Sequence, residues 1–340
     1  MAHRSHILLA HGGGGQLTDE LIASSILPRL GNPSLNALLD SALLPAPPAG
    51  HRLAFTTDAY VVTPWRFAGG DIGRLAVCGT VNDLAVCGAQ PLGLSLSLIL
   101  AEGLPIADLE TILDSIAAAA QEAGTHVVTG DTKVVGQKQA DGIFITTAGI
   151  GTVPESCHLS PQQVRPGDVL LVNGHLGAHG LAVMLTRHLP EAHTNLRSDV
   201  APLNSLTGSL QQALGADLVF MRDATRGGLA GLVADLARSS GYRIVLQEEA
   251  LPISPQAAHA AAMLGLDILE IANEGKLVAV VRAAQAAKAL EVMRCHPLGA
   301  MARIIGAVAP PPDGLAILQT RIGGQRIIQK PHGELLPRIC

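Results

Sequence analysis

Aromatic residues and charged residues are scarce in this sequence of 340 residues. Only 2% of its residues are aromatic and 15% are charged, whereas 48% are hydrophobic, so Ala, Val, Leu and Ile must form most of the core. Such a composition suits packed α/β layers, and the length is sufficient for two domains of ~100–200 residues each. Basic runs are absent and the formal net charge is −5, which excludes the electrostatic footprint of a nucleic-acid-binding protein.

Long apolar runs are missing as well. No hydrophobic run approaches the ~18 residues that a transmembrane helix requires. The apolar stretch near the start, residues 7–10, is too short for a signal peptide. We therefore expect no membrane association and a cytoplasmic location.

The five cysteines include no C-x-x-C pair, and their number is odd. This pattern argues against a disulfide framework and against a tetrahedral zinc site, and it favours reduced thiols in a reducing compartment. Cys78 and Cys87 lie in an apolar stretch, so we expect both to be buried as small hydrophobic side chains.

Four consecutive glycines, residues 12–15, lie between a predicted strand at residues 7–10 and a predicted helix at residues 18–26. Thr18 is a suitable N-cap for that helix. Glycine-rich backbone ahead of a helix can surround an anion with N–H groups, so this run is a candidate phosphate site. A flexible linker is the alternative, because the spacing of the usual phosphate loop is absent from the chain.

Aspartates recur in the first half at or near the ends of predicted elements. Asp58 and Asp131 each follow a predicted strand, and Asp83 interrupts an apolar helix together with Asn82. One such aspartate is usually a turn former, but three of them, with Lys133 nearby, indicate a site for a divalent cation and phosphate. Mg²⁺ favours a few carboxylates plus substrate phosphates over a complete protein cage.

The second half repeats the α/β pattern after a proline-containing linker at residues 154–167. His175 and His179 are four residues apart, but glycines surround them and no Glu lies between them, so we expect loop histidines rather than metal ligands. Residues 221–228 combine two arginines, an aspartate, a threonine and two glycines at a helix start, which suits phosphate binding. A capped helix entry with surface arginines is the alternative.

The sequence ends in Leu-Pro-Arg-Ile-Cys, and glycines and prolines interrupt the segment before it. A cysteine at a loosely held chain end is a candidate mobile nucleophile, a thiol that moves between sites. The alternative is a frayed tail with an incidental Cys340. The residues alone therefore indicate a phosphate-binding α/β protein with a mobile thiol.

Motifs along essentially the whole chain resemble those of the HypE family, the [NiFe]-hydrogenase maturation proteins that make cyanide for the active-site iron. The Asp and Gly motifs are shared with the wider superfamily of aminoimidazole ribotide synthetase, selenophosphate synthetase and thiamine-phosphate kinase, whereas the Pro-Arg-Ile-Cys ending is specific to HypE. The stretches that carry the resemblance are residues 11–15, 57–62, 69–75, 79–85, 129–135, 179–180, 221–228, 272–278 and 336–340.

The resemblance implies a two-domain α/β (α+β) fold like that of aminoimidazole ribotide synthetase. The first domains of two subunits would pair their sheets in a homodimer, with ATP between the domains and a mobile carboxyl-terminal tail. The expected divisions are a Gly-rich segment and helix (1–39), an ATP-binding and dimerisation domain (40–153), a linker (154–167), a second α/β domain (168–312), and a final strand with the tail (313–340).

The resemblance also implies a role for each matching residue. Cys340 carries the reacting group, with Lys133 and Glu274 as candidate bases. Mg²⁺ is held by Asp58, Asp83, Asp131 and Asp223, with Asp40 as a weaker fifth candidate. ATP is bound by Gly12, Gly13, Gly14, Gly15, Asn82, Thr132, Arg222 and Arg226.

In the implied reaction, the partner HypF transfers a carbamoyl group to Cys340. ATP then phosphorylates the amide oxygen, which makes it a good leaving group, and loss of phosphate leaves a thiocyanate. The cyanide passes to iron on the HypC–HypD complex. We expect the tail to alternate between an outward and an inward state, biased by ATP.

Two other functions compete with this interpretation. Another ATP-dependent enzyme of the superfamily is one, but selenophosphate synthetase would require a reactive Cys near the N-terminus, and no cysteine precedes Cys78. A non-catalytic thiol carrier or metallochaperone is the other, although a carrier needs no Mg²⁺–ATP site.

Overall fold

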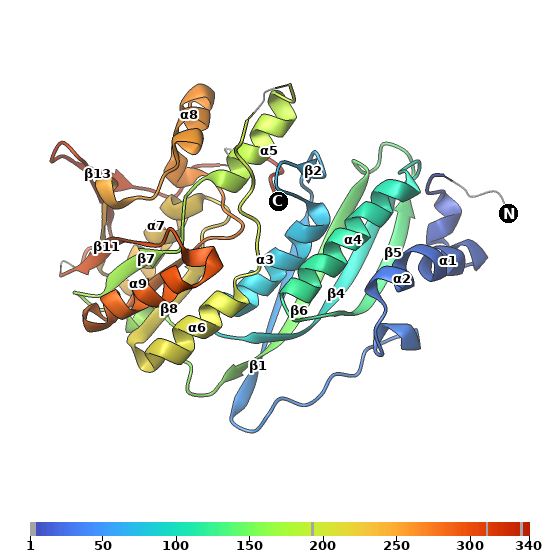
Figure 1. The fold of residues 1–340 in the computed structure, drawn as a ribbon, viewed down its shortest axis with the longest axis horizontal. Coiled ribbons are helices and arrows are strands. Elements are labelled where there is room, and N and C mark those ends of the chain that lie inside the picture. Colours follow the sequence, from blue (N-terminus) through green and yellow to red (C-terminus); the bar gives the residue numbers. More distant parts are fainter. Residues whose placement is uncertain (1–4, 192–193, 311, 334–335) are drawn as a thin grey trace.

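The computed structural model describes residues 5–191, 194–310, 312–333 and 336–340. Its two domains are a four-stranded and a seven-stranded sheet with their helices (Figure 1). The predicted two-domain α/β architecture is thus confirmed. Parts of the predicted first segment (residues 1–4), of the proline run (residue 311) and of the tail (residues 334–335) lie outside the described residues.

The bounds of the helices and strands, in chain order, are α1 (Gln16–Leu21), α2 (Leu27–Leu30), β1 (His51–Tyr60), β2 (Arg66–Phe67), β3 (Gly70–Asp71), α3 (Ile72–Val86), β4 (Gln90–Ala101), α4 (Ile106–Glu122), β5 (Val127–Val135), β6 (Ile143–Pro154), β7 (Val169–Val172), α5 (Ala178–His188), α6 (Asn204–Leu214), β8 (Leu218–Asp223), α7 (Gly228–Ser240), β9 (Arg243–Gln247), α8 (Pro255–Leu264), β10 (Leu277–Val281), α9 (Ala286–Cys295), β11 (Arg303–Ala309), β12 (Ala316–Gln319) and β13 (Gln325–Ile328).

The N-terminal sheet has the strand order β1-β6-β4-β5, so β1 and β5 are its edges. Neighbouring strands lie ~4.8 Å apart, which separates the two edges by roughly 14 Å. Asp58 lies inside β1 and Asp131 inside β5, rather than after the ends of the strands. Pairing extends the strands beyond the expected ends, because β1 stays paired with β6 as far as Tyr60 and β5 with β4 as far as Val135.

Helix α3 joins the two domains. Asp71 caps its N-terminus by accepting a 2.9 Å hydrogen bond from the backbone N–H of Arg74. Almost every residue of the helix is buried, because α3 contacts the N-terminal sheet and α4 as well as α6 and β8 of the other domain. This position places Asn82 and Asp83 at the junction between the domains.

The segment before β1 differs from its prediction. Residues 7–10 form no strand; Leu9–Gly12 is a 3-10 turn, held by the N–H of Leu8 donating to His11 Nδ1 at 2.9 Å. The predicted helix exists, but it comprises α1, a π-helical turn at Ile22–Ile26, and α2. Within residues 7–10, Ile7 exchanges backbone hydrogen bonds with the residues after β4, because its N–H donates to Leu104 and its carbonyl accepts from Gly103, each at 2.8 Å.

The seven-stranded sheet of the C-terminal domain has the order β13-β12-β9-β11-β7-β10-β8. Its central strand segments are buried on both faces, as the uninterrupted apolar sequence of Leu277–Val281 indicates. The edge strand β8 contacts α3, and it therefore delivers Asp223 to the junction between the domains.

Helices α3 and α4 cover one face of the N-terminal sheet (Figure 1). Within the described parts of the chain, no helix covers the opposite face. There Leu53 and Phe55 on β1 expose 59% and 70% of their surface, and Ile150 on β6 lies beside Phe55. An apolar sheet face left uncovered in this way is suited to contact with another protein surface.

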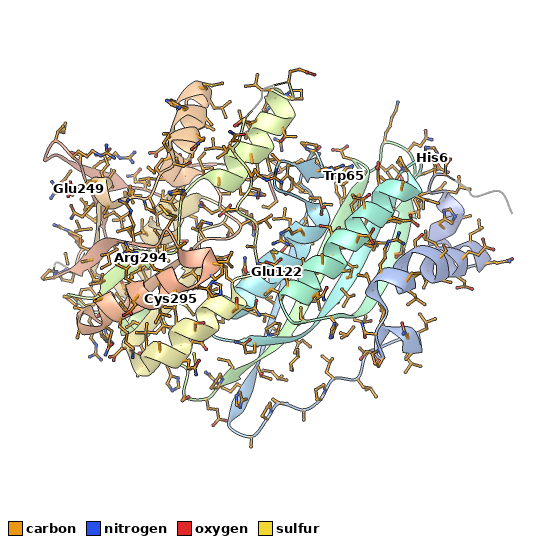
Figure 2. The ribbon with its side chains drawn as sticks, in the orientation of Figure 1. His6, Trp65, Glu122, Glu249, Arg294 and Cys295 are labelled. Atoms are coloured by element: carbon orange, nitrogen blue, oxygen red, sulfur yellow. The ribbon has the colours of Figure 1, made fainter. Side chains whose placement is uncertain are left out.

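The cysteines divide by environment. Cys78 is buried in α3, as expected, but the prediction for Cys87 is wrong because this residue is exposed. Cys87 lies just after the last turn of α3, where the chain leaves the core through the left-handed Gly88 (φ 88°). Cys295, at the end of α9 (Figure 2), is also exposed.

Candidate active site

Acidic side chains from three elements meet beside α3. Asp58 lies on β1, Asp83 on α3 and Asp223 at the end of β8, and α3 contacts both of these strands. The hydroxyl of Thr56 donates to Asp83 Oδ2 at 2.7 Å, and the hydroxyl of Tyr60 donates to Asp58 Oδ2 at 3.1 Å. We refer to Asp58, Asp83 and Asp223 as the carboxylate cluster.

Burial and mutual repulsion dominate the electrostatics of this cluster. The pKa of Asp58 is raised, first by burial and then by the negative charge of Asp83. The pKa of Asp223 is raised from 3.8 to about 7, first by burial and then by Asp83. Because like charges held in a poorly solvated site resist ionisation, the cluster favours a proton or a bound cation.

Glu274 lies next to the cluster, on the loop before β10, and is only 3% exposed. Burial, followed by the negative charges of Asp223 and Asp199, raises its pKa well above the ordinary value. Its loop is firmly anchored, because the backbone N–H groups of Glu274 and Gly275 both donate to Asp199 at 3.2 Å. Lys276 Nζ pairs with Asp199 at 3.0 Å, which lowers the pKa of Asp199 despite its burial.

The carboxyl-terminal segment brings Cys340 to the same junction, between β2 and α3 (Figure 1). Leu336 and Ile339 are both buried at 5% exposure, and Cys340 is half-buried against the same core. The backbone N–H of Val61 donates to the carbonyl of Cys340 at 3.1 Å. Val61 follows Asp58 by three residues, or about 10 Å along an extended chain, so the tail brings Cys340 to the end of the strand that carries Asp58.

A cavity of about 400 Å³ lies beside the thiol. Its lining includes Cys340, Arg226, Lys330 and Glu270. Arg226 also acts on the buried acids, since its positive charge partly offsets the effect of burial on the pKa of Glu274. Arg226 therefore connects the cavity beside Cys340 with the acidic groups.

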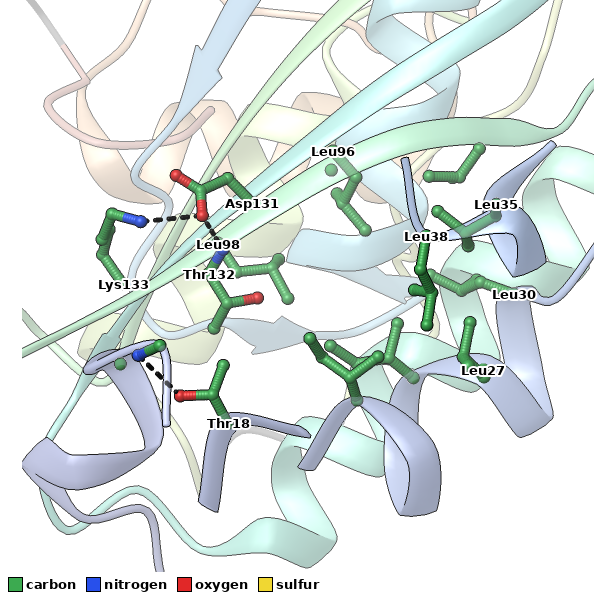
Figure 3. Close-up of a pocket in the computed structure, with 16 residues that line it drawn as sticks. Thr18, Leu27, Leu30, Leu35, Leu38, Leu96, Leu98, Asp131, Thr132 and Lys133 are labelled. Carbon is green, nitrogen blue, oxygen red and sulfur yellow. Dashed lines mark hydrogen bonds and ion pairs between the residues drawn. The ribbon is translucent and has the colours of Figure 1, made fainter. Parts of the chain in front are cut away.

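A second group of predicted residues lines a separate cavity of about 180 Å³ beneath α1 and α2. Figure 3 shows Asp131, Thr132, Lys133 and Thr18 at one end of it and leucines from several elements at the other. Lys133 Nζ pairs with Asp131 Oδ1 at 2.8 Å, and this hydrogen bond lowers the pKa of Asp131. The N–H of Thr132 donates to the same carboxylate oxygen at 2.8 Å.

The glycine run lies over this second cavity. Gly12 is required by close packing, because a Cβ at this position would lie 2.4 Å from the backbone nitrogen of Val134 on β5. The N–H of Gly14 donates to Thr18 Oγ1 at 3.0 Å, and Gly13 and Gly15 complete the turn that leads into α1. The run is thus held against the edge of the sheet.

A single chain does not bring all the predicted site residues together. Asp58 and Asp131 lie on opposite edge strands, roughly 14 Å apart. Cys340 and Glu274 lie on the side of Asp58, whereas Lys133 lies on the side of Asp131. The candidate site therefore consists of two halves, one at each edge of the N-terminal sheet.

The side chain of Asn82 binds the protein's own backbone and does not face a nucleotide site. Its Nδ2 donates to the carbonyls of Ala201 and Glu274, each at 3.1 Å, and its Oδ1 accepts from the N–H of Leu203 at 2.7 Å. Both amide N–H groups are taken by the backbone, so the predicted contact of Asn82 with a nucleotide is not available in this conformation. Asn82 instead ties α3 to the C-terminal domain.

Arg222, the other predicted arginine, points away from the cluster. Its guanidinium pairs with Asp235 at 3.4 Å, and Lys330 pairs with the same carboxylate at 3.0 Å. Arg238 is a further partner of Asp235. Three cations around one carboxylate leave an excess of positive charge near the entrance to the cavity beside Cys340.

His179 and Arg187 both contact the tail, and the sequence predicted neither contact. His179 is not a loop histidine as expected, because the helix α5 begins at Ala178, directly after the left-handed Gly177 (φ 80°), and buries His179 completely. Arg187, on the last turn of α5, donates to tail carbonyls. A sequence cannot show this contact, since the two partners lie about 150 residues apart in the chain.

The donor set of the carboxylate cluster fits Mg²⁺ with phosphate ligands, because its oxygens are hard ligands. The raised pKa values of Asp58 and Asp223 indicate that compensating positive charge is lacking there. Over the described ranges, no group of three or more acidic, His or Cys side chains is arranged to hold a metal ion by itself. Asp58, Asp83 and Asp223 would therefore hold Mg²⁺ only together with substrate phosphates.

Comparisons with known proteins agree with this geometry. The sequence profiles of the AIR synthase related protein N-terminal and C-terminal domains match residues 39–153 and 165–317. A carbamoyl dehydratase HypE from Rhizobium leguminosarum bv. viciae is 46% identical over 98% of this chain and 94% of its own length.

Solved structures give the same result. A crystal structure of the hydrogenase maturation protein HypE in complex with ATP is 39% identical, with a TM-score of 0.93 over 98% of this chain and 99% of that chain. A HypE chain from a HypE–HypF complex is 42% identical, with a TM-score of 0.79 over 93% of this chain and 100% of that chain. The chain therefore belongs to the HypE family of carbamoyl dehydratases, within the AIR synthase related proteins.

Proposed function

We propose that this protein uses ATP to dehydrate a carbamoyl group carried on the sulfur of Cys340, and that the resulting thiocyanate supplies the cyanide ligands of the [NiFe]-hydrogenase iron. One observation carries the proposal. The tail delivers Cys340 to a junction that also holds the carboxylate cluster and the buried acid Glu274. A thiol near candidate Mg²⁺ ligands and a candidate base matches the chemistry of an ATP-driven dehydration.

The reaction needs ATP because an amide oxygen is a poor leaving group. Attack of that oxygen on the γ-phosphorus forms an O–P bond and releases ADP. Loss of phosphate then breaks the C–O bond, and removal of two protons from the nitrogen leaves S–C≡N. The protein contributes chiefly by positioning and by electrostatic stabilisation of the transferring phosphoryl group.

Bound Mg²⁺ would neutralise charge on the phosphates, held by Asp58, Asp83 and Asp223 on one side and by Asp131 on the other. Arg226 lines the cavity beside Cys340, so its guanidinium is placed to form an ion pair with a phosphate group. The surplus of positive charge around Asp235 would attract the nucleotide to the entrance.

The base is the group that needs a raised pKa. Glu274 has one, because it is buried among other acids, and its backbone is fixed by Asp199. A carboxylate with a raised pKa is a stronger base when it ionises, which suits it to strip a proton from the amide nitrogen. We assign this role to Glu274 and a proton-relay role to Lys133.

ATP binding is supported by the cavity under the glycine run. It has an apolar end formed by leucines of α2 and the following turn, and a polar end with Asp131, Thr132 and Lys133 (Figure 3). A nucleotide has the same division, with an apolar base and charged phosphates. Gly12, Gly13, Gly14 and Gly15 cover the polar end, where phosphate would lie.

A homodimer would unite the two halves of the site. The uncovered sheet face with Leu53 and Phe55 is apolar and lacks a cover from its own chain's described helices. If two chains pair these faces in opposite directions, the edge strand β5 of one subunit approaches β1 of the other. Asp131 and Lys133 of one subunit would then complete the site that holds Cys340 and Glu274 of the other.

We also propose HypF as the carbamoyl donor and the HypC–HypD complex as the cyanide acceptor. A HypE–HypF complex among the solved relatives supports the first partner. None of the helices that the structure describes is both long enough and apolar enough to cross a lipid bilayer. We also propose a cytoplasmic location, which agrees with the free thiols of Cys78, Cys87 and Cys295.

The test separates a dehydratase from a thiol carrier. ATP hydrolysis is measured with wild type and with Cys340→Ala, each with HypF and carbamoyl phosphate and each without them. Because ATP consumption is coupled to dehydration of the carbamoyl group, we expect hydrolysis above background only in wild type with the complete mixture. Equal hydrolysis in the Cys340→Ala variant would remove Cys340 from the ATP reaction and favour another ATP-dependent enzyme.

A further inference from the structure

Helix α5 contacts the backbone of three successive tail residues. Arg187 Nη1 donates to the carbonyl of Pro337 at 2.8 Å, and Arg187 Nη2 donates to the carbonyl of Arg338 at 2.7 Å. His179 Nε2 lies 2.7 Å from the carbonyl of Ile339. The carbonyls of residues 337, 338 and 339 thus each receive a hydrogen bond from a side chain of α5.

Arg187 also holds the segment on which the tail rests. Its Nε donates to the carbonyl of Thr63 at 2.8 Å. The backbone N–H of Thr63 in turn donates to the carbonyl of Arg338 at 3.2 Å, and Val61 donates to Cys340. One guanidinium therefore joins the tail to residues 61–63, the segment that follows β1. Its donors form a fixed planar group and are directed at three carbonyls.

His179 is oriented for its contact before the tail arrives. A carbonyl can only accept, so Nε2 carries the hydrogen and Nδ1 accepts from the hydroxyl of Ser198 at 2.8 Å. Ser198 Oγ accepts from the N–H of Val200 at 3.2 Å, and Phe67 packs against the imidazole ring in a T-shaped arrangement at a centroid distance of 5.2 Å. These contacts come from outside the tail, so they persist when the tail leaves.

Two apolar side chains complete the binding of the tail. Leu336 and Ile339 are both buried, and Gly180 leaves the room that Leu336 occupies, since a Cβ there would lie 3.0 Å from Leu336 Cδ1. None of these contacts involves the sulfur of Cys340. The tail can therefore be bound in the same way whatever group the sulfur carries.

From this geometry we propose that His179 and Arg187 are positioning residues that bind the inward tail through its backbone carbonyls and so hold Cys340 at the carboxylate cluster. This inference deepens the proposed function and rests on it for the role of the sulfur. It predicts that α5 sets the balance between the inward and outward states. The outward tail would meet the carbamoyl donor, and the inward tail would undergo dehydration.

The test measures the exposure of Cys340 without any enzymatic step. Wild type, Arg187→Met, His179→Leu and His179→Gln are treated with N-ethylmaleimide, and modification of the Cys340 peptide is followed by mass spectrometry, which separates it from the exposed Cys87 and Cys295. We expect about tenfold or faster modification in Arg187→Met and in His179→Leu, because each variant loses the hydrogen bonds that its side chain makes to tail carbonyls. His179→Gln should stay near the wild-type rate, since the amide retains an N–H donor at the position of Nε2.

Arg243→Met is the matched control, because Arg243 forms an ion pair with Asp313 away from the tail. It should modify Cys340 at the wild-type rate. Thermal unfolding of each variant shows whether the fold is kept. Rates equal to wild type in both Arg187→Met and His179→Leu would overturn the inference, as would a His179→Gln variant that is as fast as His179→Leu.

A second measurement separates this inference from the proposed function. With HypF and carbamoyl phosphate, Arg187→Met should be carbamoylated at least as fast as wild type but dehydrated about tenfold more slowly, because only dehydration needs the inward tail. A merely destabilised protein would lose both steps together, which would count against positioning. If wild-type protein forms no thiocyanate while the alkylation pattern holds, the proposed function fails and the tail-binding role of α5 stands.

Discussion

Replacing Asp223 by Asn should stabilise the substrate-free protein at alkaline pH but not in mild acid. Asp223 has a pKa of about 7 in the folded protein, against an ordinary value of 3.8, first because of burial and then because of Asp83. Between these two values the folded protein holds a proton that the unfolded chain has lost. Stability therefore falls as the pH rises from 3.8 to about 7. An asparagine carries no charge and escapes this loss.

The magnitude follows from the shift. One pKa unit corresponds to ~1.4 kcal/mol, so the interval from about pH 5 to about pH 7 gives an upper limit of roughly 2.7 kcal/mol for one carboxyl. The side chain of Asp223 is half-buried rather than fully enclosed, and solvent screens part of the repulsion. We therefore expect the variant to gain about 1–2 kcal/mol over wild type when the pH rises from about 5 to about 8.

The assay is urea unfolding of wild type and Asp223→Asn at both pH values, without nucleotide or Mg²⁺. The exposed Asp114→Asn variant on α4 is the control, and its difference from wild type should be the same at both pH values. Mg²⁺ with ATP should recover stability for wild type at about pH 8 more than for the variant, because bound cation offsets the repulsion. A pH-independent difference for Asp223→Asn would refute the reasoning, since it would show that Asp223 is not held among like charges.

Three further predictions concern other parts of the site. Glu274→Gln should raise the free energy of unfolding at neutral pH, because it removes a buried acid with a raised pKa. Intact mass of the same variant should show carbamoylation by HypF without dehydration, and full dehydration would exclude Glu274 as the base. Gly12→Ala should weaken ATP binding about tenfold in calorimetry, because it pushes the glycine run away from Val134. Gly208→Ala on α6 is the control, since its new Cβ would meet only the flexible end of the Gln90 side chain, and it should bind ATP normally; equal affinities would contradict the packing argument. Asn82→Ala should lower the free energy of unfolding in urea by ~2–4 kcal/mol, because three buried hydrogen bonds between the domains are lost. A decrease below about 1 kcal/mol would show that Asn82 does not hold the domains together.

Local patterns were sufficient for most elements of the fold. The apolar run at Leu277–Val281 and the helical periodicity of Ile106–Glu122 each predict the observed element. A strand buried on both faces is apolar throughout, whereas a helix buried on one face repeats its apolar residues every three to four positions. Residues 7–10 show where this fails. Their apolar run looks like a strand, but the glycines that follow direct the backbone into a turn instead.

The site was predictable in its residue types more than in its arrangement. The aspartates and Glu274 stand out in the sequence because acids are costly to bury within apolar stretches. Their division between two sheet edges depends on strand order, which the sequence does not reveal. The contacts of His179 and Arg187 with the tail were not predictable either. Every residue type has a backbone carbonyl, so the sequence does not show which carbonyls accept these hydrogen bonds.

The central claim is that Cys340 carries a carbamoyl group which ATP converts to a thiocyanate. Intact mass spectrometry after incubation with HypF, carbamoyl phosphate and ATP tests it most directly, with wild type and Cys340→Ala side by side. We predict a carbamoyl adduct in wild type that further ATP converts to a species one water lighter, with neither species in the variant. An adduct that persists unchanged with ATP, or one that forms equally in Cys340→Ala, would contradict the account.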